Sequence, residues 1–271
     1  MINNRMNIKK LLLWIVVGGV VLGTAGLSYV LRPTPVASAP IEAVPLRIDT
    51  EVPEPAPPLA TATPGGPTAL PELPAESGSE PTAGAAPDVS APSGLVVYVI
   101  SQDESEVRFS IDEILNDAPT TAVGTTNQIA GEIAVDFGNP ANSQVGVITV
   151  NARTLTTDRE NRNRMIRNEI LDTDPYEFIT FTPTAVTGLP AAIVPGESVT
   201  FQVTGDLTIR DVTLTVTFDV TAVVDADGRL AGYAVTSVLR SDYGITIPSV
   251  PSVAEVSNEV LLEFDFVANP K

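Results

Sequence analysis

The clearest pattern in the chain is a strict alternation of apolar and polar residues from Val199 to Val224, VTFQVTGDLTIRDVTLTVTFDVTAVV. Alternation with a period of two predicts β-strands that bury one face and expose the other to water. The break at Arg210-Asp211 predicts a turn between two long antiparallel strands. The residues expected on the inward faces are Val199, Phe201, Val203, Leu207 and Ile209, then Val212, Leu214, Val216, Phe218, Val220 and Ala222.

Shorter runs of β-branched and aromatic residues recur from about Gly94 to the end of the chain. They predict seven further strands, at residues 96–100, 106–111, 129–137, 144–153, 178–186, 230–240 and 258–268. The 116–127 segment is longer than a hairpin turn, and we expect it to form a loop at a barrel mouth.

One stretch, Thr157 to Leu171, has a different pattern, with apolar residues at roughly helical spacing. It predicts a short helix that is capped at Thr157 or Asp158. Strands joined by short turns, with a single helix, favour an all-β antiparallel barrel of roughly eight strands over a parallel sheet. We therefore expect residues 94–271 to form one barrel domain.

The segment from Leu11 to Leu31 carries no charge over 21 residues. At about 1.5 Å per residue it would be about 31 Å long as a helix, which matches a hydrocarbon core of about 30 Å. Arg5, Lys9 and Lys10 precede it and only Arg32 follows closely. The positive-inside rule then predicts a single-pass anchor at 11–31, with residues 1–10 in the cytoplasm and the rest of the chain on the extracytoplasmic side.

A cleaved signal peptide is the alternative, because Ala37-Ser38-Ala39 resembles a small-residue processing site. The apolar run is longer than the roughly 7 to 15 residues usual for a signal, and Pro40 would follow the cut, so we favour the retained anchor.

Residues 32–93 contain 15 of the 24 prolines, with alanine, threonine and an excess of acidic residues. Such a composition cannot bury a core, and it predicts a disordered linker. As a flexible coil, this linker would span roughly 40 to 50 Å.

Composition limits the chemistry that the chain can carry out. It has no cysteine and no histidine, which excludes disulfides, thiolate nucleophiles, Cys/His zinc sites and a Ser-His-Asp triad. The net charge of −18 argues against a nucleic-acid partner. Carboxylates remain, yet none is marked by its context as catalytic, and we expect neither a catalytic residue nor a metal ion nor a cofactor.

The predicted domain resembles the YceI-like family of lipocalin-like barrels that enclose polyisoprenoid or similar lipid chains. The resemblance covers about 170 residues, nearly all of the predicted domain. It is carried by YVISQDESEVRFSI (98–111), GEIAVDF (131–137), ARTLTTDRENRNRMIRNEILDTDPYEFITFTP (152–183), GDLTIRDVTLTVTFDV (205–220), LRSDYGI (239–245) and VSNEVLLEF (256–264). Two positions depart from the family pattern: Asp211 replaces a turn glycine, and Asp174-Pro175-Tyr176 inverts a Tyr-Pro order.

The resemblance implies a membrane-tethered barrel that binds, stores or carries a polyisoprenoid or other long-chain lipid in its interior. The residues alone favour a core filled by its own side chains, whereas the resemblance implies an open one. The candidate lining residues are Val107, Phe109, Ile148, Val150, Phe181, Phe201, Val203, Val216, Phe218, Val235 and Phe264.

Three charged residues are candidates for the polar end of the ligand site: Arg159, Arg240 and Asp242. Arg240 and Asp242 are more simply explained as an ion pair within the domain. Arg159 belongs to a cluster with Arg153, Arg162, Arg164 and Arg167, which could meet a lipid phosphate but is more often a solvated face neutralised by nearby carboxylates.

Asp225-Ala226-Asp227-Gly228 resembles the start of a calcium loop but lacks the glutamate that such a loop needs, and it predicts a hairpin turn instead. Two other function classes stay open. One is an interaction module with a filled core that docks a partner protein, and the other is an enzyme that acts on a lipid through carboxylates. Partner proteins cannot be named from the sequence.

Overall fold

The computed structural model describes residues 33, 36–38, 40–47, 94–249 and 253–271. The predicted cytoplasmic residues, the predicted anchor at 11–31 and most of the predicted linker lie outside these residues. No helix among the described residues has the length and apolarity needed to cross a membrane.

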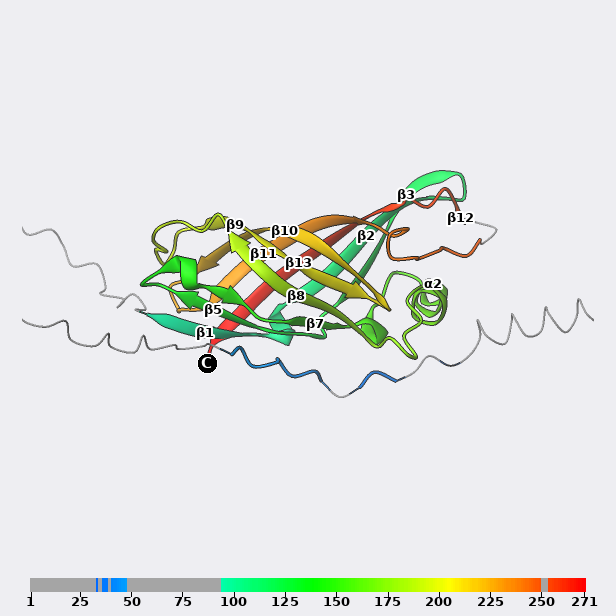
Figure 1. Cartoon of the computed structure of the whole chain (residues 1–271). Coiled ribbons are helices and arrows are strands. Elements are labelled where there is room, and N and C mark those ends of the chain that lie inside the picture. The colour runs from blue at the N-terminus through cyan, green and yellow to red at the C-terminus, as the bar shows by residue number, and fades with distance from the viewer. Residues whose placement is uncertain (1–32, 34–35, 39, 48–93, 250–252) are drawn as a thin grey trace, which may run out of the picture. The chain divides into compact units, whose positions relative to one another are not determined.

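Thirteen strands and one short helix make up the described fold (Figure 1). The strands are β1 (Leu95–Ile100), β2 (Glu106–Leu115), β3 (Ala118–Thr126), β4 (Ile129–Ala130), β5 (Glu132–Asp136), β6 (Gln144–Val145), β7 (Ile148–Asn151), β8 (Phe178–Thr187), β9 (Val199–Ile209), β10 (Val212–Val224), β11 (Leu230–Leu239), β12 (Val253–Ala254) and β13 (Glu259–Pro270). The helical elements are α2 (Glu160–Met165), the π-helical turn η4 (Ile166–Ile170) and the 3₁₀ turns η1 (Gln102–Glu104), η2 (Pro140–Asn142) and η3 (Ala152–Thr154).

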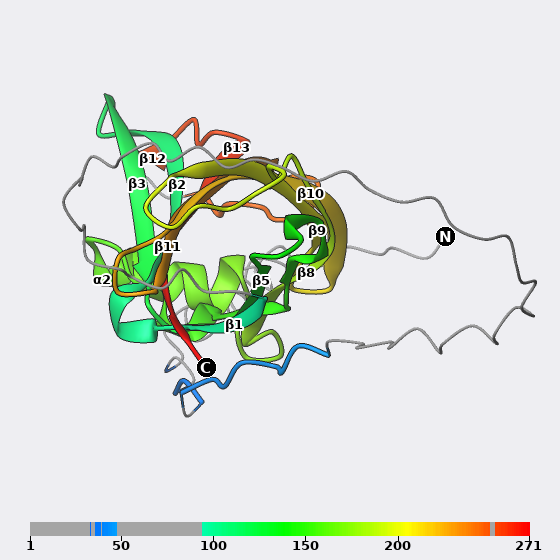
Figure 2. The ribbon, with the colours of Figure 1, turned by 90° about the vertical axis from the view of Figure 1, so that its left-hand side faces the viewer.

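The strands form one antiparallel sheet that curls round on itself. Its order is β4-β7-β8-β9-β10-β11-β13-β1-β5-β6, and the two ends meet because β4 and β5 are consecutive and separated only by Gly131. The Ile100 amide donates to the Gly131 carbonyl oxygen at 3.1 Å across this junction. The end-on view in Figure 2 shows the resulting ring of strands. The predicted all-β antiparallel barrel with one short helix is confirmed, but the sheet has thirteen strands where roughly eight were expected.

The long hairpin predicted from the alternating run is present. β9 pairs along its whole length with residues 212–222 of β10, and the turn lies at Arg210-Asp211, where Arg210 adopts a positive φ of 59°. The apolar members of both strands lie on the buried side, as the period of two predicts.

The predicted loop at residues 116–127 is wrong, because most of it is strand β3. β3 pairs with β2 from Leu115↔Ala118 to Val107↔Thr126, and only Asn116 and Asp117 form the turn. Both turn residues have positive φ, 50° and 63°, as a tight two-residue hairpin requires. Asn and Asp tolerate this conformation well, so the Asn-Asp pair was the overlooked turn signal.

The predicted helix is shorter than expected and starts later. α2 begins at Glu160 with Arg159 as its N-cap residue, and no side chain caps it. The Thr157 hydroxyl instead accepts from the Arg159 amide at 3.3 Å and donates to Asn163 at 2.7 Å, so the predicted cap at Thr157 or Asp158 is wrong. α2 and η4 lie at the barrel end where β8 begins and β9 ends (Figure 1).

Candidate ligand cavity

The barrel encloses a cavity of about 800 Å³. Its wall is formed mainly by aliphatic and aromatic side chains of β2, β5, β7 to β11 and β13, and α2 contributes residues at one end. This volume falls within the range of about 300 to 1,000 Å³ that is typical of small-molecule sites. The interior is therefore hollow, in contrast to the filled core that the residues alone favoured.

Glycines on neighbouring strands explain how large side chains line the cavity without filling it. A β-carbon added at Gly124 would lie 2.2 Å from the ring of Phe109, its direct cross-strand partner. A β-carbon at Gly232 would likewise lie 2.5 Å from the ring of its partner Phe266. The rings thus occupy the space that β-carbons on the next strand would take, which keeps them close to the wall.

A related contact occurs on β9, where a β-carbon at Gly205 would lie 2.7 Å from the ring of Phe181, which lies diagonally across from it on β8. Phe181 also packs edge-on against Phe218, with the ring centroids 5.1 Å apart. Phe264 and Phe266 form a second, tilted pair at 5.2 Å. These contacts between rings fix the aromatic part of the wall.

All the predicted lining residues except Val216 and Val235 border the cavity. Val216 lies on the inward side of β10 and packs against the core without reaching the cavity wall. The prediction for Val235 is wrong, because its neighbour Ala234 is buried and borders the cavity instead. In the β11 run AVTSV, apolar residues occur at both odd and even positions, so the sequence does not show which face of the strand points inward.

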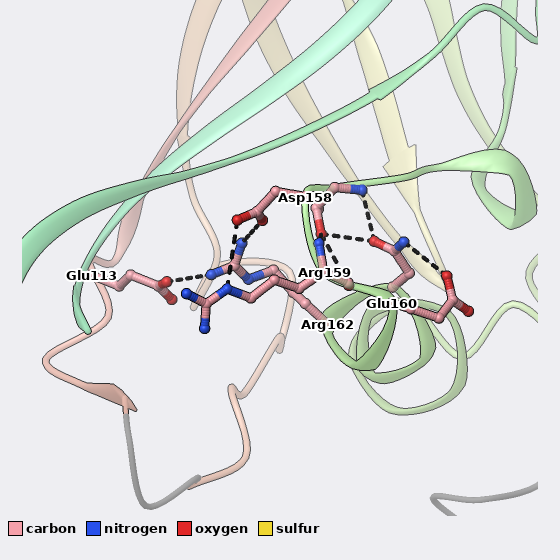
Figure 3. Close-up of polar contacts among 7 residues, drawn as sticks. Glu113, Asp158, Arg159, Glu160 and Arg162 are labelled. Carbon is pink, nitrogen blue, oxygen red and sulfur yellow. Dashed lines mark hydrogen bonds and ion pairs between the residues drawn. The ribbon is translucent and has the colours of Figure 1, made fainter. Parts of the chain in front are cut away.

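A network of charged side chains borders the cavity at α2, and Figure 3 shows the contacts among them. Glu113 occupies the inward side of β2, and its carboxylate lies 2.6 Å from Arg162 Nη2 of α2. Arg162 Nη1 also lies 2.5 Å from Asp158 Oδ1. The side chains of Glu113 and Arg162 are only 7% and 16% exposed, so this ion pair fastens the helix to the barrel from within.

Sequence reasoning missed Glu113 and gave Arg162 only as one of a cluster. The signal was present in β2, where Glu113 is the single charged residue on a face that is otherwise apolar. The other residues on that face are Val107, Phe109, Ile111 and Leu115. A buried carboxylate needs a charged or hydrogen-bonding partner. The partner could not be identified from the sequence because Arg162 is 49 residues away.

Asn163 orders the loop that precedes α2. Its Oδ1 accepts from the amide and the hydroxyl of Thr157, both at 2.7 Å, and its Nδ2 donates to Glu160 at 3.2 Å. Asn163 is 4% exposed, so these bonds satisfy a buried amide. They place Asp158 beside Arg162 and Arg159 beside the cavity.

The three candidates for a polar end have separate positions. Arg159 and Arg240 border the cavity, and Asp242 does not. Arg159 lies 3.5 Å from Asp158 and its side chain is half exposed. The predicted ion pair between Arg240 and Asp242 is wrong, since both residues are described and no such pair forms. The Arg240 guanidinium donates instead to the carbonyl oxygens of Ser257, Ile245 and Val256.

Every arginine of the predicted basic cluster has a carboxylate partner. Arg153 lies 2.7 Å from Glu177, while Arg164 and Arg167 lie 3.7 and 3.3 Å from Glu160. With the pairs of Arg159 and Arg162, this agrees with the predicted neutralisation by nearby carboxylates. The predicted solvated face is wrong for Arg153, Arg162 and Arg167, whose side chains are only 14%, 16% and 12% exposed.

Tyr243 is the largest polar side chain buried in the cavity wall. It is 2% exposed, and its hydroxyl has no hydrogen-bond partner among the described residues. Burial, with a smaller contribution from the negative charge of Asp242, raises the pKa of Tyr243 to about 12. The hydroxyl is therefore neutral throughout the physiological pH range.

The predicted hairpin turn at Asp225 is confirmed. Asp225 Oδ1 accepts from the amides of Asp227 and Arg229 at 3.0 and 2.8 Å. Among the residues that the structure describes, no group of acidic side chains is arranged to hold a metal ion.

Comparisons with known proteins agree with this architecture. The model of the YceI-like domain family matches residues 98–268. Protein YceI of Shigella flexneri is 28% identical over 146 residues, which cover 52% of this chain and 72% of the relative. Protein YceI of Salmonella arizonae is 27% identical over 146 residues, with the same coverage of 52% and 72%.

A solved structure supports the fold. The structure of a polyisoprenoid binding domain from Saccharophagus degradans, implicated in plant cell wall breakdown, is similar to this chain with a TM-score of 0.51 and 14% identity. The similarity covers 64% of this chain and 98% of that chain. At such identity it shows a shared fold.

Proposed function

The chain belongs to the YceI-like domain family, and on that premise we propose that its barrel binds a polyisoprenoid or another long-chain lipid in the apolar cavity. The proposed activity is binding, storage or carriage without a catalysed reaction. The Saccharophagus degradans relative is itself described as a polyisoprenoid binding domain.

The observation that carries this proposal is the open cavity with its apolar wall. Moving a hydrocarbon chain from water into such a space yields about 0.8 kcal/mol for each CH₂ group buried. A ligand with ten buried methylene groups would gain on the order of 8 kcal/mol before the costs of binding. Hydrocarbon burial is therefore sufficient for tight binding without a dedicated polar contact.

We also propose that residues 11–31 anchor the chain in the cell membrane and that the barrel lies on the extracytoplasmic side. The uncharged 21-residue run and the basic residues before it support this arrangement. Lipid in that membrane would be the source or the destination of the cargo.

A pair of adjacent substitutions in β11 tests the cavity directly. Ala234→Trp would project an indole into the cavity, whereas Val235→Trp would place the same indole on the opposite face of the same strand. The full-length protein, purified in detergent and stripped of lipid, would be incubated with radiolabelled polyprenol or labelled palmitate and then analysed by native mass spectrometry.

We expect the unaltered protein and Val235→Trp to retain labelled polyprenol, and Ala234→Trp to lose most of it. Failure of the unaltered protein to take up either lipid would refute the proposal and favour a module that docks a protein partner. Equal retention by the two variants would show that the lipid binds elsewhere. Conversion of the lipid to a new mass would indicate an enzyme.

A further inference from the structure

A short segment of the predicted linker is docked against the barrel. Residues 36–38 and 40–46, called here the strap, have no regular secondary structure, yet barrel side chains hold them at several points. Gln102 Nε2 donates to the Ile41 carbonyl oxygen at 2.8 Å, and Arg153 Nη1 donates to that of Val36 at 3.2 Å. The disordered linker predicted for 32–93 did not anticipate these contacts.

The first fixed point of the strap is Ser38. Its amide and hydroxyl donate to the two carboxylate oxygens of Glu177, each at 2.7 Å. Asn151 Nδ2 and Arg153 Nη1 also donate hydrogen bonds to the Glu177 carboxylate, at 2.9 and 2.7 Å. Burial alone would raise the pKa of Glu177, but the bonds from Ser38 and Asn151 and the charge of Arg153 outweigh it and lower the pKa.

The second fixed point is Leu46. Its amide donates to Glu132 Oε2 at 2.9 Å, and Lys271 Nζ lies 2.9 Å from the other carboxylate oxygen. The Glu132 side chain is 5% exposed. Burial again opposes ionisation, and the Leu46 and Lys271 contacts outweigh it, so the pKa of Glu132 lies below its ordinary value. The buried Glu132 and the largely buried Glu177 each accept hydrogen bonds from the strap.

The direction of the strap fixes which end of the barrel is nearest to the predicted anchor. Ser38 binds Glu177, which directly precedes β8 at the α2 end, and Leu46 binds farther along the barrel at β5 (Figure 1). Only the four residues 32–35 lie between the apolar run that ends at Leu31 and the docked Val36. The five Cα-to-Cα steps from Leu31 to Val36 span at most about 18 Å, whereas a linker free up to residue 93 would span roughly 40 to 50 Å.

From this geometry we propose that the strap holds the α2 end of the barrel against the lipid bilayer, so that the cavity end bordered by α2 faces the membrane. Residues 48–93 then join two points on the same barrel and add no reach to the tether. The inference rests on the membrane anchor of the proposed function, but not on the nature of the cargo.

The chain is suited to a direct test, because it contains no cysteine and a single introduced thiol labels one site. Asp211→Cys marks the β9–β10 turn at the α2 end, and Asp227→Cys marks the β10–β11 turn at the opposite end. The 13-residue strand β10 separates these exposed turns by roughly 40 Å. Full-length protein carrying either donor dye would be reconstituted into vesicles of phosphatidylethanolamine and phosphatidylglycerol with a headgroup acceptor dye.

We expect energy transfer to be several-fold stronger from residue 211 than from residue 227. Ser38→Pro with Leu46→Pro removes both amide donors while preserving an extended chain. This double variant should abolish the difference between the two sites and weaken the transfer at both. A matched control, Glu42→Pro with Val44→Pro, adds two prolines at exposed strap residues that donate no amide hydrogen bond to the barrel, and it should keep the difference.

Equal transfer from both sites in the unaltered strap, or a difference that survives Ser38→Pro with Leu46→Pro, would overturn the inference. Hydrogen exchange of the unaltered full-length protein gives a second measurement, since fast exchange at the Ser38 and Leu46 amides would also overturn it. Flotation with the vesicles tests the anchor, and a chain that does not float removes the premise. Retention of labelled polyprenol tests cargo binding separately, and we expect the strap variants to retain it.

Discussion

Gly124 and Phe109 lie directly opposite each other on β3 and β2, and the Phe109 ring occupies the space where a β-carbon of residue 124 would lie. The contact is with the far end of a side chain that can rotate. Because residue 124 has no β-carbon, the Phe109 ring can lie against the wall, and this helps to keep the cavity open.

Gly124→Ala should turn the Phe109 ring toward the cavity, because the new β-carbon would stand 2.2 Å from the present ring position. We expect the variant to fold and to bind long polyprenols more weakly than short ones. Isothermal binding of polyprenols of increasing length measures the change. Gly124→Ala with Phe109→Leu should restore the capacity, and unaltered length dependence in the single variant would contradict the mechanism.

Phe218→Asp should abolish lipid retention or unfold the domain. The substitution removes the edge-on contact with Phe181 and places a charge on the apolar wall. Loss of a packed phenylalanine alone costs about 3–5 kcal/mol. Thermal unfolding and native mass spectrometry check the result against Thr221→Asp, which adds the same charge on the exposed face of β10. Unchanged stability together with full lipid content would show that residue 218 does not face inward.

Arg162→Ala should destabilise the barrel by about 3–5 kcal/mol, since it leaves the buried Glu113 carboxylate without its cationic partner. Chemical unfolding gives the free energy. Adding Glu113→Gln removes the stranded charge and should recover a large part of the loss. If Arg162→Ala alone were neutral, the ion pair would not be what holds α2 on the barrel.

Docking of the strap should weaken in acid. The pKa values of Glu132 and Glu177 are lowered in the docked state, so their contribution is complete above the ordinary value of about 4.5 and disappears as the pH falls through the lowered values. Hydrogen exchange at Ser38 and Leu46, measured at pH 7 and after brief exposure to stepwise lower pH below about 4.5, should show loss of protection in acid. Arg153 and Lys271 stay charged across this range, and Glu132→Gln with Glu177→Gln should remove the pH dependence.

Tyr243→Phe should leave the stability unchanged or raise it, because the buried hydroxyl has no partner and burying it costs about 1–3 kcal/mol. Tyr233→Phe is the matched control, as its hydroxyl donates to Glu263 at 2.7 Å and its removal should cost about 1 kcal/mol. A difference of about 1 kcal/mol corresponds to roughly 2–4 °C in Tm for a domain of this size. Equal destabilisation by both variants would mean that the Tyr243 hydroxyl is hydrogen-bonded.

The alternating run alone determined the longest hairpin, its turn at Arg210-Asp211 and the inward side of both strands, because side chains of a strand alternate with an exact period of two. The same rule failed in β11, where apolar and small residues occupy both faces and Val235 was placed inward in error. The period of two was not recognised at 116–127, because the threonine pairs in this segment interrupt the alternation. The segment forms strand β3, and its turn is only two residues long.

Only the tertiary structure decided whether the interior is open, because that depends on which glycine of one strand lies opposite which ring of the next. The partners of Glu113 and Glu177 were equally hidden, since Arg162 and Ser38 are 49 and 139 residues away from them. Local pattern sets the secondary structure and the buried face. Register and closure of the barrel bring distant residues together, and they create the cavity, the buried ion pair and the docking site of the strap.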